Sequence, residues 1–577
     1  MTARNIATFI ILAFVAILPY LGILPGWNVP LATLTALMAI SLVGLNLIFG
    51  VTGMLSLGQS AFVVIPGYVS GILHSFGVPF WAAIVVGLVA SIVIARLVAE
   101  VFIRLPGIYF AIGTLGFAFV VEGLARAFPS VTGGASGLVF ELPVSLTRNQ
   151  WYLISIGSLS LALISFALLV RGRFLRTLQL VRHDELAAQV LGIDVVKVKA
   201  RVFTIGSAYS AIGGLLFTYY VSVLTPENGG VNASLESLAM LVIGGAGSIM
   251  GPFLGAAAIQ WLFAIAGEAK SYELLVYGLG FFLFVLYAPT GIVGLLSRAW
   301  PAASPHLAPT RQGTPVPHSE AELNTAKLVE GEPSYEVQGI CLEVENVAKH
   351  FGGLKAVEDI SFQVRPGQIV ALIGPNGAGK STLFNLVSGI EVPTHGRILL
   401  HGKDLINVAI HERASSIGRS FQVPRLIPDL TALDNVLSRL DNLPGTRGSA
   451  LDAASARLHL ETFGLGDLAD NRASQIGLGQ HKLIEIVRAA IGNPPLLLLD
   501  EPAVGLTPEE VERLAALLRV LKSRGTAILV VEHNVGFVST VADEVVVMET
   551  GKLIAIGRPQ AVMADKKVQD AYFGALT

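Results

Sequence analysis

The stretch "LIGPNGAGKSTL" at residues 372–383 ends an apolar run, "QIVALIG", that is typical of a buried strand. Its glycines let the backbone curl so that N–H groups face phosphate oxygens at the N-terminus of the next helix. Lys380 is predicted to reach the terminal phosphates, and the Ser381 hydroxyl to bind Mg²⁺. A strand before this motif and a helix after it complete the context of a nucleotide-binding loop. The predicted nucleotide-binding residues are Gly374, Pro375, Asn376, Gly377, Ala378, Gly379, Lys380, Ser381 and Thr382.

Two later strands predict the rest of the nucleotide site. In "PLLLLDEP" (495–502) the leucines indicate a strand buried on both faces, with Asp500 at its end on the metal side of the phosphates. Glu501 is placed to accept a proton from an attacking water. The strand "AILVVEH" (527–533) ends at His533, for which we predict a γ-phosphate contact. Gln422, in "RSFQ", is a predicted ligand of the metal and the water, which gives Ser381, Gln422 and Asp500 as the Mg²⁺ ligands.

The composition excludes a wholly water-soluble chain. Its 577 residues exceed one core, hydrophobic residues make up 53% and charged residues 14%, whereas about a quarter of the residues are charged in an ordinary soluble protein. The net charge of −2 argues against a nucleic-acid partner. The single cysteine, Cys341, excludes an intrachain disulfide. The apolar N-terminal run could be a signal peptide, but without a clear cleavage site a retained membrane helix is the better interpretation.

Residues 1–300 predict an all-α membrane domain with about eight crossings. A crossing needs roughly 20 apolar residues. The basic stretch 171–201 indicates a cytoplasmic loop. The apolar runs lie near 6–24, 29–50, 61–76, 80–100, 105–126, 152–170, 202–223 and 272–297.

Glycines interrupt a further apolar stretch, 236–268, for which we predict a re-entrant segment. The basic loop before 201 and the ATP-binding half after 300 are both predicted to be cytoplasmic, so the chain must cross the membrane an even number of times between them. As a helix this glycine-interrupted stretch would be about 45 Å long, which is too short for two crossings. We therefore expect 244–251 in the protein interior near a translocation path, or else as a plain glycine-rich helix contact. The polar residues Thr52, Ser56, Gln59 and Ser60 predict either hydrogen bonds between helices or a substrate path.

Residues 301–338 are rich in proline, serine and polar residues and predict a flexible linker, while 339–577 alternate strand and helix and predict an α/β domain. Residues 341–577 resemble an ATP-binding cassette (ABC) ATPase. The resemblance implies that Phe351 stacks on adenine, that Gln422 is the Q-loop glutamine, that Glu501 is the general base and that His533 is the switch histidine. Thr507, in the implied D-loop, stands where Asp or Asn is more usual.

The signature that contacts a neighbouring cassette's ATP departs from the family's Leu-Ser-Gly-Gly-Gln pattern. Here it is Ile476, Gly477, Leu478, Gly479 and Gln480, with glycine in place of serine. The missing hydroxyl removes a hydrogen bond to charged phosphate worth roughly 1.5–3 kcal/mol. The backbone N–H of Gly479 and the N-terminus of the helix that follows still face the anion. The change concerns the ATP of the partner cassette, and the site at Lys380 is unaffected.

The membrane half is similar to the permease subunit of branched-chain amino-acid ABC importers, through "GMLSLGQSAF", "TGGASGL" and "GGAGSIMGPFLGAA". "HDELAAQVLGI" (183–193) resembles the importers' coupling loop, with Glu185, Ala187, Ala188 and Gly192 as the matching residues. The chain therefore looks like a natural fusion of one permease with one ATPase, driving uptake of a branched-chain or related amino acid across the inner membrane.

The resemblance implies a second permease, a second ATPase and an extracytoplasmic substrate-binding protein; two copies of this chain are the alternative assembly. An exporter half-transporter is the rival within transport, although the short spans and the coupling loop favour import. A membrane-anchored regulatory ATPase is the rival outside transport, although a plain anchor has no use for polar, glycine-broken membrane segments.

Overall fold

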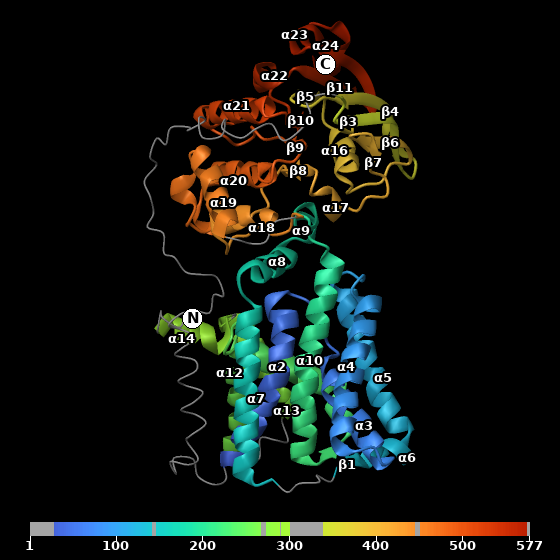
Figure 1. Ribbon diagram of the computed structural model, residues 1–577, viewed down its shortest axis with the longest axis vertical. Helices are drawn as coiled ribbons and strands as arrows, with labels where there is room; N and C mark the ends of the chain where they lie inside the picture. The colour runs from blue at the N-terminus through green and yellow to red at the C-terminus, as the bar shows by residue number, and fades with distance from the viewer. Residues whose placement is uncertain are drawn as a thin grey trace. The chain divides into compact units, whose positions relative to one another are not determined.

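The computed structural model describes residues 28–140, 146–266, 273–288, 290–299, 339–444 and 450–573. The chain forms two compact units (Figure 1). The first is helical and the second is α/β, which confirms the predicted fold class. The segment 183–194 lies inside the range predicted for the membrane domain, yet it packs with the α/β unit. The predicted run 6–24 and the linker 301–338 lie outside the described residues.

Five helices in the described part of the chain are long and apolar enough to cross a membrane. They are Asn28–Val51 (α2 Asn28–Leu45 continued by the π-helix η1 Asn46–Val51), α4 Phe80–Phe102, α5 Gly107–Ala127, α7 Arg148–Leu169 and α10 Val195–Val221. Shorter helices are α3 Gln59–Ser75, α6 Pro129–Thr132, α8 Gly172–His183, α11 Val231–Gly244, α12 Gly251–Ala266, α13 Glu273–Tyr287 and α14 Gly291–Ala299. Two short strands, β1 Leu138–Val139 and β2 Val223–Leu224, pair antiparallel. Predicted run 272–297 is two helices, because the chain turns at Gly291 with a φ of 65°.

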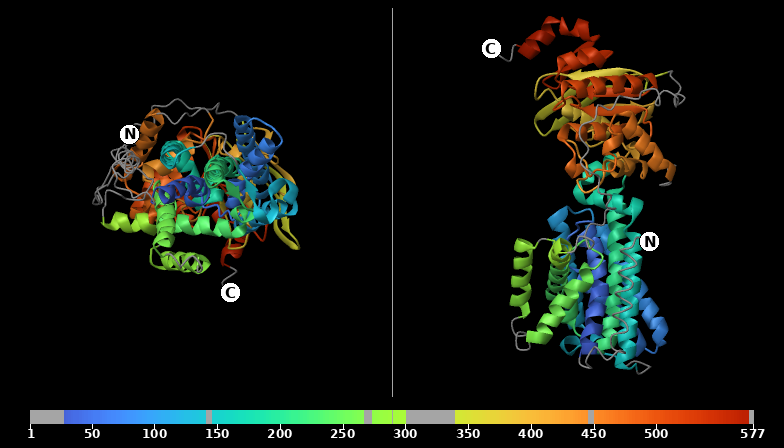
Figure 2. Two further views of the ribbon diagram at one scale, coloured as in Figure 1. Left: turned by 90° about the horizontal axis from the view of Figure 1, so that it is seen from below. Right: turned by 90° about the vertical axis from the view of Figure 1, so that its left-hand side faces the viewer.

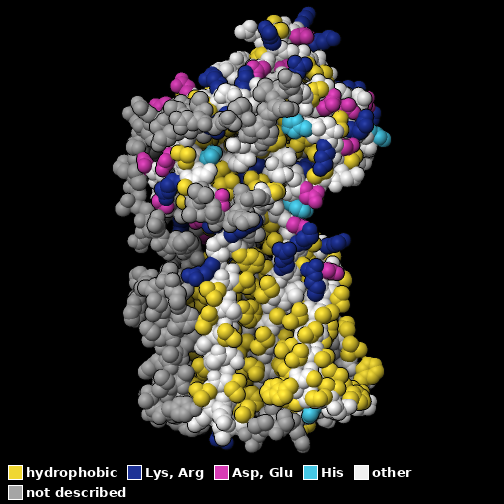
Figure 3. Space-filling model, viewed as in Figure 1, with side chains coloured by type: hydrophobic (Ala, Val, Ile, Leu, Met, Phe, Trp, Pro, Cys, Tyr) yellow, Lys and Arg dark blue, Asp and Glu magenta, His cyan; other side chains and the backbone are white. Residues whose placement is uncertain are grey.

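The outer face of the helical unit is apolar, as a lipid-facing surface must be. Hydrophobic side chains cover the visible face of this unit (Figure 3). Large side chains on α4 and α5 are strongly exposed, among them Trp81 at 73% and Ile108 at 70%. A water-soluble protein rarely exposes an apolar surface of this extent, so this face supports membrane embedding.

Glycines set the close approach of α10 to α2 and α3, which lie beside it in both views (Figures 1 and 2). A Cβ on Gly44 would lie 2.0 Å from the carbonyl oxygen of Gly206, and one on Gly214 would lie 2.0 Å from that of Val63. Small residues at helix contacts are the usual means of packing helices in a membrane, where there is no hydrophobic drive between them.

The glycine-rich break between α11 and α12 is partly buried, with Ala246 exposed, and its backbone bonds to the side chains of Asn46 and Ser248. Gly244, Ser248 and Gly251 are buried. The fully buried Asn46, at the start of the π-helix, donates from Nδ2 to the Ser248 carbonyl at 2.8 Å and accepts the Gly247 N–H at Oδ1 at 2.7 Å. Asn46 thus pairs backbone groups that the break leaves without helical partners. The re-entrant path itself stays a prediction.

Of the four predicted polar residues in 49–62, Thr52, Gln59 and Ser60 make hydrogen bonds to their own or neighbouring helices, whereas the buried Ser56 hydroxyl has no partner among the described residues. Thr52 Oγ1 donates to the Ile48 carbonyl at 2.5 Å, and Gln59 Nε2 donates to Ser210 Oγ at 2.6 Å. Ser60 Oγ lies 2.8 Å from the Gly230 carbonyl oxygen, for which it is the donor. These contacts fit the first of the two predicted explanations, bonding between helices.

The α/β unit is built on two sheets. The central six-stranded sheet has the order β12-β11-β5-β10-β9-β8, and a four-stranded sheet has the order β4-β3-β6-β7. Their strands are β3 Leu342–Phe351, β4 Leu354–Val364, β5 Ile369–Ile373, β6 His395–Leu400, β7 Lys403–Asp404, β8 Ile417–Arg419, β9 Leu496–Asp500, β10 Ala527–Val531, β11 Glu544–Glu549 and β12 Lys552–Gly557. Strands β5, β9 and β10 run parallel with their apolar side chains buried, so their carboxyl ends meet at one edge of the sheet.

The helices of this unit cover the sheets and build a mostly helical lobe. They are α9 Glu185–Val190, α16 Lys380–Ser388, α17 Ile410–Arg413, α18 Ala432–Leu440, α19 Ala450–Thr462, α20 Leu478–Ala490, α21 Pro508–Ser523, α22 Val535–Val541, α23 Pro559–Met563 and α24 Lys566–Phe573. A large apolar cluster joins α18, α19, α20 and α21 to β9 and β10. The nucleotide motifs lie at the edge where the carboxyl ends of the parallel strands meet.

Candidate functional site

The phosphate-binding loop joins β5 to α16 and requires glycine. Gly374, Gly377 and Gly379 have φ values of 149°, 82° and 92°, which L side chains rarely adopt. A Cβ on Gly379 would also lie 2.2 Å from the Ala356 carbonyl oxygen. Lys380 starts α16 and donates from Nζ to the carbonyls of Gly374 and Pro375 at 2.7 and 2.9 Å. Burial lowers the pKa of Lys380, and the charges of Glu501 and Asp500 oppose that shift.

The three predicted catalytic residues meet around one carboxylate. Gln422 Nε2 donates to Glu501 Oε2 at 2.8 Å, and His533 Nε2 lies 3.0 Å from Glu501 Oε1. Glu501 follows β9 with a φ of 47°, a left-handed conformation that is costly for a non-glycine residue. Its backbone N–H donates to the Val531 carbonyl at 2.9 Å, which links β9 to β10. The carboxylate is therefore positioned by both its backbone and its side-chain partners.

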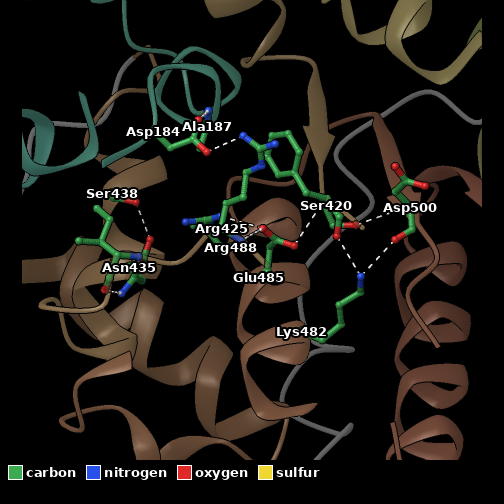
Figure 4. Close-up of polar contacts among 12 residues, drawn as sticks. Asp184, Ala187, Ser420, Arg425, Asn435, Ser438, Lys482, Glu485, Arg488 and Asp500 are labelled. Carbon is green, nitrogen blue, oxygen red and sulfur yellow. Dashed lines mark hydrogen bonds and ion pairs between the residues drawn. The ribbon is translucent and has the colours of Figure 1, made fainter. Parts of the chain in front are cut away.

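Asp500 lies beside this group at the end of β9. Burial raises the pKa of Asp500, while the charge of Arg419 lowers it. The Asp500 N–H donates to Ser420 Oγ at 3.3 Å (Figure 4). Ser381 is exposed at the start of α16. Serine, amide and carboxylate oxygens at Ser381, Gln422 and Asp500 are hard donors of the kind Mg²⁺ prefers, so the residues present fit the predicted metal.

Two side chains of α20 that sequence reasoning missed bind the backbone of residues 421–425, which we call the Q-loop. Lys482 Nζ donates to the carbonyls of Phe421, Gln422 and Asp500 at 2.9, 2.6 and 3.2 Å. Glu485, with no exposed surface, accepts the N–H groups of Phe421 and Arg425 at 3.1 and 2.8 Å.

The charge of Glu485 is balanced inside the protein. Arg488 Nη2 lies 3.1 Å from Glu485 Oε1, and both side chains are buried (Figure 4). Burial raises the pKa of Glu485 and lowers that of Arg488, while each charge opposes the shift of the other. Arg488 is three residues from Glu485, whereas the Q-loop partners of Glu485 are 60 and 64 residues away, so no local motif indicated those contacts.

Glu532 is a second buried carboxylate that the sequence reading passed over. It accepts the N–H groups of Ala503, His533 and Asn534 at 2.8, 3.1 and 3.4 Å. Burial raises its pKa. Glu532 thereby fixes the loop after Glu501 to the loop that carries His533, although it precedes His533 directly in the quoted strand motif.

The short helix α9 packs on the same unit as the Q-loop. Asp184 caps α9 by accepting the Ala187 N–H at 2.9 Å, and its other oxygen accepts a bond from Arg425 Nη1 at 2.5 Å (Figure 4). Ala187, Val190 and Phe421 form an apolar cluster. The predicted residue Ala188 is fully buried, whereas Glu185 is exposed. Asp184, which the sequence reading did not select, makes the charged contact.

Gly192 follows α9 where only glycine fits. Its φ is 92°, and a Cβ there would lie 3.1 Å from the Asn442 carbonyl oxygen. Next to it, Asp194 Oδ2 lies 3.6 Å from His411 Nε2. The segment 183–194 is thus held by polar side-chain contacts at both ends and by apolar contacts in the middle.

Residues 357–504 match the ABC transporter family, and residues 29–288 match the permease component of the branched-chain amino acid transport system. The high-affinity branched-chain amino acid transport ATP-binding protein BraF of Pseudomonas aeruginosa is 36% identical over 248 residues, which cover 40% of this chain and 97% of BraF. Its counterpart LivG of Escherichia coli K12 is 36% identical over 250 residues, covering 40% of this chain and 97% of LivG.

The chain belongs to the branched-chain amino-acid-type ABC transporters. It is a fusion of their permease and ATP-binding components, and it hydrolyses ATP in coupling with transport. Two further similarities, like those to BraF and LivG, are to the cassette of this ABC transporter. The lipopolysaccharide export ATP-binding protein LptB of Haemophilus influenzae is 34% identical over 238 residues, 40% of this chain and 97% of LptB. A crystal structure of an ABC transporter cassette in its ADP conformation is 32% identical, covers 41% of this chain and 100% of that one, and has a TM-score of 0.38.

The signature of this ABC transporter lies at the start of α20. Gly477 is the N-cap residue of the helix, Leu478 is 70% exposed and Ile476 is buried. A Cβ on Gly477 would have only Gln480 Oε1 within 4 Å, at 3.8 Å. The backbone there would accept a serine, so the glycine is not required by packing.

Two further ABC positions have local explanations. Thr507, where the family more often has Asp or Asn, caps α21 and forms a capping box with Glu510. Threonine, Asp and Asn all cap helices well, which explains why threonine is accepted at this position. Phe351, predicted to stack on adenine, ends β3 with 45% of its surface exposed, and Lys349 Nζ lies 4.9 Å from the centre of its ring. An exposed ring of this kind has an open face for stacking.

Proposed function

We propose that this ABC transporter takes up a small amino acid, branched-chain or related, as the fused permease and ATPase subunit of an importer. The permease family matched by residues 29–288 and the names of the relatives BraF and LivG support the substrate class. The importer-like segment 183–194 supports the direction.

One observation carries the coupling of ATP hydrolysis to transport. The Q-loop contacts the nucleotide site and α9 at once: Gln422 bonds to Glu501, while Phe421 and Arg425 contact α9. A change in the position of Gln422 on nucleotide binding therefore displaces the surface on which α9 packs. Such a linkage lets nucleotide bias a two-state membrane element.

In this proposal each residue has a defined task. The N–H groups of the phosphate loop and Lys380 bind the phosphates, and Glu501 accepts the proton of the attacking water. Gln422 and His533 orient the Glu501 carboxylate, and His533 contacts the γ-phosphate. When bound, Mg²⁺ on Ser381, Gln422 and Asp500 would neutralise charge on the phosphates.

The proposed assembly places the chain in the inner membrane, with the ATPase unit in the cytoplasm. It would include a second permease subunit, a second ABC ATPase contacted by the signature, and an extracytoplasmic binding protein. Two copies of this chain are the other assembly to test. The proposed membrane domain has about eight crossings and the re-entrant segment 236–268, followed by the flexible linker 301–338.

The experiment is ATP-driven uptake by the complex purified through a tag on this chain. Right-side-out vesicles enclose ATP and Mg²⁺, with labelled L-leucine and the binding protein outside. Glu501→Gln should abolish accumulation while ATP still binds, and Glu461→Gln, an exposed carboxylate on α19, should transport normally. Normal ATP turnover in Glu501→Gln would exclude it as the base. ATP-dependent loss of leucine from a second set of vesicles, preloaded with the labelled amino acid, would favour an exporter. ATP turnover without movement of leucine in either direction would favour a regulatory ATPase.

A further inference from the structure

A cavity of about 100 Å³ lies inside the helical unit, among elements far apart in sequence. A single water needs roughly 10–15 Å³ of such volume, so the cavity has room for a molecule of several heavy atoms. Helices α2, α3, α10 and α11 and the turn Pro226–Gly229 line it. Ser60 of its lining belongs to the polar segment for which a substrate path was one of the two predictions, and the ATP site does not account for the cavity.

Most of the residues that line the cavity are apolar. Leu37 and Leu42 of α2 and Met240 of α11 are buried residues of the surrounding core. Among the others, Met38 and Phe217 are half-buried. Methionine adapts to ligands of irregular shape, so the apolar lining suits an aliphatic group.

The remaining lining residues are polar and include one carboxylate. Among the described lining residues Glu236 alone is ionisable, and it lies on α11, the C-terminal half of which is apolar. Asn228 Oδ1 accepts two bonds from Thr225, at 3.0 and 2.9 Å, which leaves its Nδ2 as a donor. Ser41 and Ser237 add hydroxyl groups.

Hydrogen bonds of Ser60 hold the polar lining residues in place. Its Oγ lies 2.9 and 2.8 Å from the carbonyl oxygens of Gly229 and Gly230 and 2.6 Å from Ser234 Oγ. These bonds tie α3 to the turn that precedes α11. Asn228 lies on this turn and Glu236 lies on α11. The polar groups are therefore presented by a bonded framework.

We propose that this cavity is an intramembrane binding site for a small solute with a cationic amine next to an aliphatic group, and that Glu236 binds the amine. A carboxylate within an apolar membrane segment is expensive and marks a ligand or ion path. A neutral amide would gain little from this charge, and a carboxylate without an amine would be repelled by it. The site rests on the proposed amino-acid transport and places one step of it in the membrane.

The test measures binding to the full-length chain in lipid nanodiscs without ATP. Labelled L-leucine is the probe, and 3-methylbutylamine, 4-methylpentanoate and urea compete with it. The amine should displace leucine, whereas the acid and urea should do so at least about tenfold more weakly. Glu236→Gln should weaken leucine binding about tenfold or more, and Glu236→Asp should restore part of it.

Glu227→Gln is the matched control, because Glu227 is an exposed carboxylate of the same region that pairs with Arg126 at 3.4 Å and does not line the cavity. It should bind leucine as the wild type does. Ser237→Trp, which fills the cavity, should abolish binding. Any one of three results would overturn the site: no leucine binding by the wild type, equal displacement of leucine by the acid and the amine, or unchanged leucine binding in Glu236→Gln.

The uptake experiment distinguishes the two proposals. Wild-type uptake with an unaffected Glu236→Gln rejects the cavity and keeps amino-acid import, while leucine binding without uptake keeps the cavity and rejects import.

Discussion

Replacing Glu485 by alanine should destabilise the ATPase unit more than any loss of a surface charge. The change would leave the buried Arg488 without its ion-pair partner and the N–H groups of Phe421 and Arg425 without their acceptor. Removing one member of a buried pair costs about 3–5 kcal/mol. For a domain of about 150–250 residues each kcal/mol shifts Tm by about 2–4 °C, so we expect a decrease of about 6–20 °C.

The chain has a reporter for this unit alone. Cys341 is the only cysteine, it is buried, and burial raises the pKa of its thiol to about 12. A maleimide dye should therefore label Cys341 only as the ATPase unit unfolds, because the reactive thiolate is scarce in the folded chain. Labelling during a temperature ramp then gives the Tm of this unit without interference from the membrane helices.

Two control variants separate the causes. Asp470→Ala removes a surface ion pair to Arg457, whose side chains are 38% and 36% exposed, and should cost about 0–1 kcal/mol. Glu485→Met with Arg488→Met removes both charges and should recover the part of the loss that comes from the unpaired Arg488, while the N–H groups of Phe421 and Arg425 stay without an acceptor. ATP hydrolysis in that double variant should no longer drive uptake, because the Q-loop loses two of its acceptor contacts. A Tm for Glu485→Ala like that of Asp470→Ala would refute the role of the pair.

Three other changes test separate parts of the molecule. Gly192→Ala forces a side chain into a φ of 92°, which costs roughly 1–2 kcal/mol; it should uncouple ATP turnover from uptake, and coupled transport would reduce 183–194 to a connector. Gly477→Ser should tighten ATP-dependent pairing of cassettes in a light-scattering assay, by roughly 1.5–3 kcal/mol for a hydroxyl bonded to phosphate; unchanged pairing would mean that no phosphate lies there. Asn46→Leu should lower the Tm of the helical unit, followed by tryptophan fluorescence, since each buried backbone group left unpaired costs roughly 1–3 kcal/mol; an unchanged Tm would mean that Asn46 is not needed at the glycine break.

The residues of the predicted nucleotide site could be selected from the sequence because each motif is local. The phosphate loop requires its glycines within a few residues, and the strands before Glu501 and His533 are recognised by their continuous apolar runs. Once these parallel strands pair, Glu501 and His533 must meet at one sheet edge. Gln422 was selected through its resemblance to a known loop; its side chain bonds to Glu501, and its role toward metal and water stays a prediction.

The contacts that link the loops could not be predicted in the same way. Lys482 and Glu485 lie on a helix where alternating apolar and charged residues are ordinary, and their partners come from a distant part of the chain. Asp184 and Arg425 are 241 positions apart, and no local periodicity records such a pair. The helical unit was predicted less sharply, because hydropathy shows apolar length but not the break before Gly291 or the bonding of Asn46 to the glycines.

The packing of 183–194 on the ATPase unit has a consequence for how such fusions arise. In the coupling that we propose, recognition of a permease by its motor would be concentrated in one small exchangeable insert, whose contacts are made by Asp184, Ala187, Ala188 and Gly192. Joining the two genes would keep the permease and the ATPase close together and would require no new interface between them. A foreign permease given this insert should recruit the same motor.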